Sequence, residues 1–230
     1  MARTSILVIS MMNHVKILLL LCVLFSSGCA AFRSAGQIER GRHALIAGST
    51  DEALTLFEEV ARNNPDYIYT YRLFRESVWT YLGRAQYAKG MLEQARLSFE
   101  RALSILPDDY LARLYLGLVS ARTGDRSRAL KEFESAMKGL YEFLEYVNYS
   151  GPFEFRWDPA REIRSELERN LAMIQGKDVD WDKLIISAEW IGRRMEQEID
   201  YVRRDEERQL ERRDRDRIRS GVSLGVGFGL

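Results

Sequence analysis

The chain repeats itself with a period of 34 residues. At that offset, the segment from Leu82 to Ala102 matches the segment from Leu116 to Ala136 at six structurally special positions. A period of roughly 20 to 50 residues indicates stacked units, each of which buries its apolar face only against its neighbours. The repeat therefore favours a solenoid over a single closed core. The matched pairs are Leu82 with Leu116, Gly83 with Gly117, Gly90 with Gly124, Ala95 with Ala129, Phe99 with Phe133, and Ala102 with Ala136.

Two stretches within this period resemble the tetratricopeptide repeat, a helix–turn–helix unit of 34 residues. "WTYLG" (79–83) and "ARLSFERALSILP" (95–107) carry its W-x2-L-G and A-x3-F-x2-A-x4-P elements. Ala53, Phe57 and Pro65 reproduce the second half once more, 42 residues upstream of the next copy. The resemblance implies an all-α solenoid of about three repeats, at 34–67, 68–109 and 110–143, within a domain spanning 29–143. The eight extra residues fall within 66–76, and we expect them to add two turns to the first helix of the second repeat.

The composition agrees with long helices, because only 4 prolines occur in 230 residues. Small residues such as Gly83 and Ala95 allow the two helices of a repeat to approach closely, and we expect Phe99 and Phe133 to fill the space between repeats. Tyr141 stands where the third copy would have its proline. Its second helix is therefore expected to run on to the Ser150-Gly151-Pro152 break.

Two further helices are expected in a C-terminal region spanning 144–202. Asp158, Pro159 and Gly176 have the types and spacing of a cap, a first helical residue and a helix end, which predicts a helix that covers the last repeat. A longer helix is expected to start near Asp180. Its apolar stripe could pack on the solenoid or on a helix of a partner. The stripe comprises Trp181, Leu184, Ala188, Ile191, Met195, Ile199 and Val202.

The last segment, 203–230, combines a highly charged stretch with a glycine-rich tail. From Arg203 to Arg219, 14 of 17 residues are charged and both signs are mixed, which predicts an exposed helix. After it, Val222, Leu224 and Val226 begin a strict alternation with Gly and Ser. Two interpretations stay open for this tail: an unstructured end, or a strand that adds to the edge of a partner's sheet.

The N-terminal stretch 1–28 has the pattern of an export signal. Lys16 precedes nine apolar residues, and small residues follow. Nine residues rise only about 14 Å as a helix, short of the ~30 Å hydrocarbon core of a bilayer. The signal is complete from Met11 or Met12, either of which could be the true start. "LFSSGCA" (24–30) resembles a bacterial lipobox, although Ser26 stands where leucine is usual.

The lipobox resemblance implies that Cys29 is lipidated and anchors the protein, with the outer membrane favoured because Ala30 follows. An ordinary cleaved signal with an incidental cysteine is the alternative. No cysteine follows Cys29, so a disulfide within the exported chain does not explain it.

The residues give no support for catalysis, a cofactor or a metal site. After the signal the chain holds one histidine, His43, and no thiol beyond Cys29, which excludes Cys/His nucleophile pairs and thiolate or multi-histidine zinc sites. Lys plus Arg and Asp plus Glu number 34 each, and this balance argues against nucleic acid as a partner. We therefore expect a binding protein and not an enzyme.

In tetratricopeptide repeats the first helix of each repeat lines a concave groove. Arg42 and Arg84 occupy the same repeat position, with Tyr87 and Arg122 nearby, which suits a peptide that carries a carboxylate. Pairing of these arginines with acidic residues of neighbouring helices is the alternative. The resemblance places fifteen residues in the groove: Ala35, Ile38, Arg42, Leu45, Ile46, Ser77, Thr80, Arg84, Tyr87, Ala88, Leu111, Leu114, Leu118, Ala121 and Arg122.

Together these features predict a lipid-anchored scaffold or adaptor that binds envelope proteins or peptide segments of them. Such a protein would assist the assembly of an outer-membrane, secretion or pilus complex. The alternative is a periplasmic subunit for ligand delivery or polysaccharide export. Both rest on likeness of architecture, which does not by itself fix a function.

Overall fold

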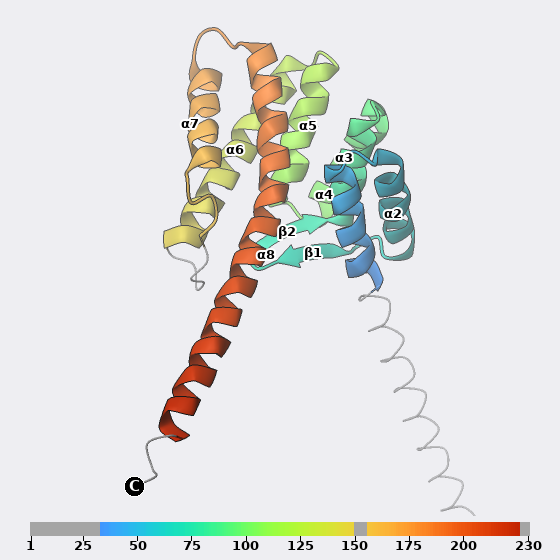
Figure 1. The fold of residues 1–230 in the computed structure, drawn as a ribbon. Helices are drawn as coiled ribbons and strands as arrows, with labels where there is room; N and C mark the ends of the chain where they lie inside the picture. The colour runs from blue at the N-terminus through green and yellow to red at the C-terminus, as the bar shows by residue number, and fades with distance from the viewer. Residues whose placement is uncertain (1–32, 150–155, 226–230) are drawn as a thin grey trace, which may run out of the picture.

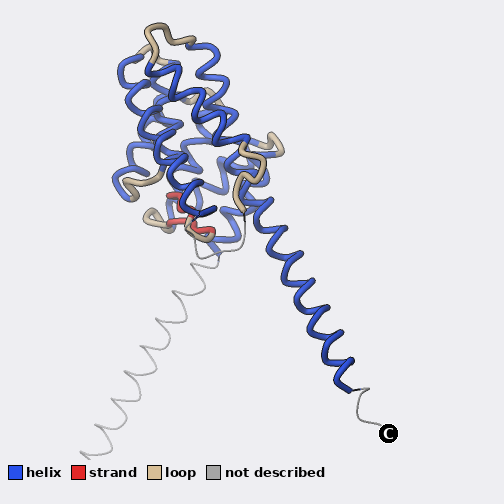
Figure 2. The backbone as a smooth tube through the Cα atoms, turned by 90° about the vertical axis from the view of Figure 1, so that its left-hand side faces the viewer, coloured by secondary structure: helices blue, strands red, loops and turns tan. Residues whose placement is uncertain are grey.

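The computed structural model describes residues 33–149 and 156–225 of the chain (Figure 1). The expected signal at 1–28, Cys29 and the end of the tail at 226–230 lie outside these residues. Helices dominate the described part, as the repeat pattern predicted, and the one sheet in it has two strands. Figure 2 shows a bundle of packed helices from which the C-terminal helix projects.

Three helical hairpins follow one another in the order that the repeats predicted. Residues 33–46 form the first helix of repeat one, and α2 (Thr50–Asn63) forms the second. Repeat two consists of α3 (Val78–Ala88) and α4 (Leu92–Ile105), and repeat three of α5 (Tyr110–Arg122) and α6 (Arg126–Tyr149). α6 runs on to Tyr149, as expected from the missing proline. The turn inside each hairpin holds a glycine with positive φ: Gly48 at 83°, Gly90 at 75° and Gly124 at 90°.

A glycine faces a phenylalanine ring within each repeat. A Cβ added to Gly83 would lie 2.6 Å from Phe99 Cε1, and one added to Gly117 would lie 2.7 Å from Phe133 Cδ1. Both rings are fully buried. The matched glycines and phenylalanines of the sequence are therefore partners across one hairpin, and any larger residue at the glycine would force its two helices apart.

The eight extra residues of repeat two form a β-hairpin, so the expected two helical turns were wrong. β1 (Ile68–Tyr71) pairs antiparallel with β2 (Phe74–Ser77), with Tyr69 opposite Glu76 and Tyr71 opposite Phe74. Aromatic and β-branched residues fill β1 and favour an extended chain. A distant segment adds to this preference, because Arg72 Nε donates a hydrogen bond to Glu206 Oε1 at 2.6 Å.

Asp109 joins repeat two to repeat three. Its carboxylate accepts hydrogen bonds from Ser77 N at 2.8 Å, Thr80 Oγ1 at 2.6 Å and Ala112 N at 2.9 Å. The last of these caps the N-terminus of α5. One buried carboxylate in the "LPDD" turn thus fixes the start of two first helices.

α7 (Glu162–Gln175) packs against α6 and α8, next to the last repeat. It begins at Glu162, later than the Pro159 start predicted from the sequence. Asp158 nevertheless caps it, accepting hydrogen bonds from Ile163 N and Arg164 N at 3.0 Å each. Ile163 and Leu167 are fully buried, and Gly176 lies at the C-terminal cap as expected.

α8 (Trp181–Gly225) is a single helix of 45 residues that crosses the molecule and extends well beyond it (Figure 1). It contacts α5 and α7. The predicted stripe from Leu184 to Val202 is at most 2% exposed, so it packs on the protein's own solenoid. None of the helices in the described residues combines the length and the hydrophobicity that crossing a bilayer requires.

The charged segment is helical, as predicted, but the helix continues further than the composition indicated. Residues 220–225 belong to α8, so the strand interpretation was wrong for this first part of the tail. The alternation of apolar and small residues is compatible with a helix because Gly and Ser can both adopt the helical backbone conformation. They only weaken it.

Candidate functional site

The first helices of the three repeats, residues 33–46, α3 and α5, form one face of the solenoid, which we call the first-helix face. It carries all four residues predicted from the sequence: Arg42, Arg84, Tyr87 and Arg122. α8 lies along this face and contacts each of them. The predicted groove positions are thus brought together, but a helix of the same chain covers them.

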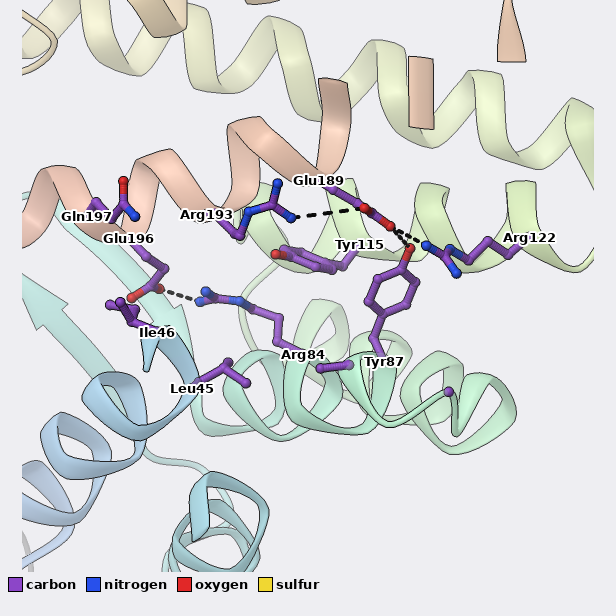
Figure 3. Close-up of a pocket in the computed structure, with 12 residues that line it drawn as sticks. Leu45, Ile46, Arg84, Tyr87, Tyr115, Arg122, Glu189, Arg193, Glu196 and Gln197 are labelled. Atoms are coloured by element: carbon purple, nitrogen blue, oxygen red, sulfur yellow. Dashed lines mark hydrogen bonds and ion pairs between the residues drawn. The ribbon is translucent and has the colours of Figure 1, made fainter. Parts of the chain in front are cut away.

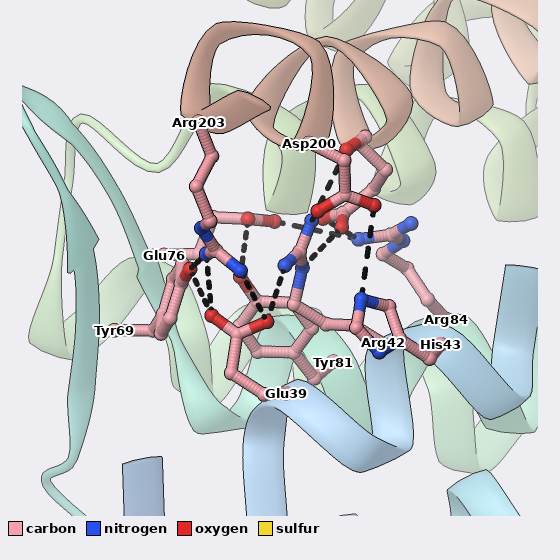
Figure 4. A network of polar contacts seen from close by, with 10 residues as sticks. Glu39, Arg42, His43, Tyr69, Glu76, Tyr81, Arg84, Asp200 and Arg203 are labelled. Carbon is pink, nitrogen blue, oxygen red and sulfur yellow. Dashed lines mark hydrogen bonds and ion pairs between the residues drawn. The ribbon is translucent and has the colours of Figure 1, made fainter. Parts of the chain in front are cut away.

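Arg42 is the centre of a buried ion cluster (Figure 4). Its side chain has no exposed surface. Nε donates to Glu196 Oε2 at 2.7 Å, Nη2 donates to the Glu196 carbonyl oxygen at 3.1 Å, and Nη1 donates to Glu39 Oε2 at 2.8 Å. Repeat one is therefore tied to α8 through both the side chain and the backbone of Glu196.

Arg84 binds the other oxygen of the same carboxylate. Its Nη1 donates to Glu196 Oε1, and Glu76 Oε1 lies 3.5 Å away. Glu76 also accepts a hydrogen bond from Tyr81 Oη at 2.5 Å. Glu196, which is 1% exposed, thus bridges an arginine of repeat one and an arginine of repeat two.

The two buried carboxyl groups titrate in opposite directions. Burial raises the pKa of Glu76 well above its ordinary value of 4.5, and the neighbouring charge of Glu196 raises it further. Burial acts the same way on Glu196, but the charges of Arg84 and Arg42 outweigh it and lower the pKa of Glu196 to about 2. The charges of Arg84 and Arg42 therefore favour an ionised Glu196 between two guanidiniums, whereas burial and the charge of Glu196 disfavour ionisation of Glu76 beside it.

Arg203 of α8 closes the cluster toward the β-hairpin. Its Nη2 donates to Glu39 Oε1 at 2.6 Å and to Tyr69 Oη at 2.7 Å. Tyr69 Oη in turn donates to Glu39 Oε1 at 2.6 Å. Although burial raises the pKa of Glu39, its hydrogen bonds with Arg203 and Tyr69 lower it overall. The hairpin is thus built into the contact between repeat one and α8.

A pocket of about 390 Å³ opens on the first-helix face next to this cluster, and Arg84 and Glu196 belong to its lining (Figure 3). In it, Glu189 Oε1 accepts hydrogen bonds from Tyr87 Oη at 2.6 Å and Arg122 Nη2 at 2.5 Å. Arg193 lies 4.0 Å from the other oxygen of Glu189. The aliphatic wall includes Ile46, which is 44% exposed. The pocket combines exposed guanidiniums with apolar surface.

The structure corrects the expectation of an open groove and agrees with the alternative drawn from the sequence. Arg42 and Arg84 are buried against Glu196, and Tyr87 and Arg122 are paired with Glu189. Arg42 has no surface for an outside ligand in this arrangement. Arg122 remains 46% exposed, so the pocket is the part of the predicted site that a partner could reach. Binding of a partner by these residues stays a prediction.

Glu189 and Glu196 are the functional residues that the sequence analysis missed. They are seven positions apart, which is about two helical turns, and they flank the apolar stripe of α8. One signal for them was available in the sequence. Two acidic residues stand two turns apart beside a buried stripe, and arginines recur at one position of the repeats with which they could pair. Pairing the two sets required knowing that α8 folds back over the repeats.

The described residues contain one histidine, His43, and it lies at the surface. The His43 side chain is 61% exposed, and its Nε2 lies 3.9 Å from Asp200 Oδ2. Within residues 33–149 and 156–225, no three His, Cys, Asp or Glu side chains are grouped so as to hold a metal ion.

The fold and the site define a class of protein, a solenoid of helical hairpins whose first-helix face carries a helix of the same chain. The family model described as tetratricopeptide repeat matches residues 77–109, from the N-cap of α3 to the N-cap of α5. This segment of the 230-residue chain is a tetratricopeptide repeat. No curated protein matches its sequence. Repeats of this family are generally protein-interaction modules and not catalysts, so the chain carries a scaffold for protein–protein interaction.

Proposed function

We propose that this protein is a lipid-anchored adaptor of the bacterial cell envelope that binds a protein partner during assembly of an outer-membrane, secretion or pilus complex. The repeat scaffold supports the binding role, and the apolar run followed by the "SSGCA" stretch supports the location. Cys29 provides the attachment site, and stable anchoring takes more than one acyl chain.

The observation that carries the proposal is the pocket beside Tyr87 and Arg122. Elsewhere on the first-helix face the arginines are buried against α8, whereas here two exposed guanidiniums, both paired with Glu189, and an aliphatic wall line the opening. Arg122 is 46% exposed and Arg193 is 61% exposed, and both are held by Glu189 alone among the ion pairs. A partner that offers acidic and aliphatic groups together matches this surface.

In-cell crosslinking tests the proposal. A photoreactive residue at Ile46, in the full chain with its own N-terminal segment, reports on the pocket without removing a polar contact. The control is the same residue at Leu97, which is 55% exposed on α4. We expect one envelope protein to be captured from position 46 and not from position 97. Equal yields from both positions would mean that the pocket is not the binding site.

The location is tested separately by Cys29→Ala. The lipid-anchor proposal expects the variant to leave the membrane fraction while its helical content is unchanged. A variant that stays with the membrane would show that Cys29 is not the anchor.

The same pocket supports a second candidate, a periplasmic subunit that delivers a small ligand or assists polysaccharide export. Its volume of about 390 Å³ lies in the range of small-molecule sites. Native mass spectrometry of the protein purified from its envelope distinguishes the two. A bound small molecule that is lost in Arg122→Gln favours delivery, whereas a bound polypeptide favours the adaptor.

A further inference from the structure

We propose that the projecting half of α8, from about residue 208 onward, lies along the surface of an anionic membrane and contacts its headgroups through a stripe of arginines. The inference rests on the proposed attachment at Cys29. It concerns a different part of the molecule from the pocket, so it can hold whatever partner the pocket binds.

The first step is the relative direction of two helices. Arg42 pairs with Glu196 and Asp200, and Glu39 pairs with Arg203, so residues 33–46 run antiparallel to α8. Two antiparallel helices advance at the same rise per residue. Continued along this pairing, Arg33 lies level with about residue 208 of α8. The chain thus enters repeat one at the end of the molecule from which α8 projects (Figure 1).

The second step compares two lengths. Arg33 follows Cys29 by four positions, and four residues span at most about 14 Å in any conformation. From residue 208 to Gly225 the helix extends about 26 Å further in the same direction. A membrane that holds Cys29 at its surface therefore lies within about 14 Å of Arg33, whereas the end of α8 lies about 26 Å beyond the level of Arg33. A projecting helix that stood perpendicular to that surface would have to enter the membrane, and the proposal therefore places it along the surface.

The third step is the charge on this part of the helix. Arg208, Arg212, Arg215 and Arg219 recur at intervals of four, three and four, which places them in one line along the helix. All four are exposed. Arg208 reaches Asp205 at 3.4 Å, and Arg215 Nε donates to the Glu211 carbonyl oxygen at 3.2 Å.

The acidic residues of the segment lie mostly on another line. Glu207, Glu211 and Asp214 have the same four-and-three spacing, one position before the arginines, so their line is turned by about 100° around the helix. Asp216 stands apart from both lines. A helix lying on a surface can thus present its arginines while the acidic line faces sideways.

The energetics suit a tethered protein. One arginine close to an anionic leaflet raises the equilibrium constant for contact between helix and membrane roughly fivefold. Four arginines together raise it by several hundredfold. Such attraction is weak for a free protein. A chain already held at Cys29 has a high effective concentration at the surface, so the same attraction is enough to fix its orientation.

The test uses the lipidated full chain in vesicles of phosphatidylethanolamine and phosphatidylglycerol. A fluorophore is attached to Ile218→Cys on the projecting segment or, as a control on the same helix, to Ile186→Cys. Both native side chains are exposed, at 67% and 66%. A quencher carried on lipid headgroups reports contact. We expect strong quenching at position 218 and little at position 186. Quenching at 218 should fall severalfold in phosphatidylcholine vesicles or in 1 M salt.

Two charge variants separate the stripe from general electrostatics. Replacing the four stripe arginines by glutamine should lower quenching at position 218 severalfold. Replacing four exposed arginines elsewhere removes the same charge and should leave it unchanged. The control set is Arg62, Arg75, Arg101 and Arg169.

Each outcome decides between the proposals. Flotation of the vesicles reports the anchor independently of quenching. Protein that floats with the vesicles but shows no quenching at 218 refutes this inference and leaves the anchor intact. Protein that does not float refutes the anchor and this inference with it. Quenching that both charge variants reduce equally would assign the contact to net charge and not to the stripe.

Discussion

Removal of the Glu196 carboxylate should loosen α8 from two repeats at once. In Glu196→Ala, Arg42 keeps Glu39 at 2.8 Å and Asp200 at 3.5 Å, but Arg84 keeps only Glu76 at 3.5 Å. Both guanidiniums stay buried, with side chains 0% and 5% exposed. The variant therefore leaves positive charge in the interior that the wild type neutralises.

The expected loss of unfolding free energy is about 3–5 kcal/mol, the range for breaking a buried ion pair from one side. The pKa of Glu196 gives a similar figure, because lowering it from 4.5 to about 2 corresponds to about 3 kcal/mol of interaction. Glu76 moderates the loss. Without the charge of Glu196 beside it, the carboxyl group of Glu76 ionises more readily and so pairs better with Arg84. The lower end of the range is therefore the better expectation.

Urea unfolding followed by circular dichroism measures this difference. Glu134→Ala is the control, since Glu134 makes an exposed pair with Lys138 and should cost less than about 1 kcal/mol. The triple variant Arg42→Met, Arg84→Met and Glu196→Leu replaces the cluster by apolar side chains, and its unfolding free energy should be close to that of the wild type. A loss below about 1 kcal/mol in Glu196→Ala would refute the reasoning, because it would mean that water reaches the cluster.

Two further predictions follow from the same structure. The difference in unfolding free energy between wild type and Glu196→Gln should narrow as the pH falls from about 5 toward 2. A carboxyl group whose folded pKa is lowered stabilises the protein above its unfolded pKa of 4.5 and loses that contribution below its folded pKa. A constant difference across this range would show that Glu196 does not titrate as described. Gly83→Ala should lower the unfolding free energy by about 1–3 kcal/mol because its Cβ meets the Phe99 ring. Gly36→Ala should raise it by about 0.5–1 kcal/mol, since nothing lies within 4 Å of that Cβ and alanine favours the helix. Equal effects of the two alanines in urea unfolding would contradict the packing assigned to Gly83.

The tertiary structure overturned the sequence analysis where distant segments compete with local preference. "DYIYTYRLFRE" (66–76) was interpreted as added helical turns, yet most of it forms a hairpin that Arg203 and Glu206 of α8 hold from 134 residues away. Arg42 and Arg84 were interpreted either as groove residues open to a peptide or as partners of acidic residues on neighbouring helices, and Glu196 of α8 decides for the second. In both cases the deciding contact comes from α8, and no local pattern in the repeats predicts that contact.

The sequence by itself determined the repeats. A glycine and a phenylalanine 16 residues apart pack against each other within a hairpin, and this pair recurs with the repeat. Because short turns join the hairpins, a local pattern suffices to predict them. The apolar stripe of α8 could also be predicted from the sequence, because burial on one face of a helix imposes a period of 3.6 residues. Only the tertiary structure decided what that stripe packs against. The choice between the chain's own solenoid and a partner depends on a buried network that joins Arg42, Arg84 and Glu196. Its members lie up to 154 positions apart in the sequence, and they meet only after α7 has turned the chain back over the first-helix face.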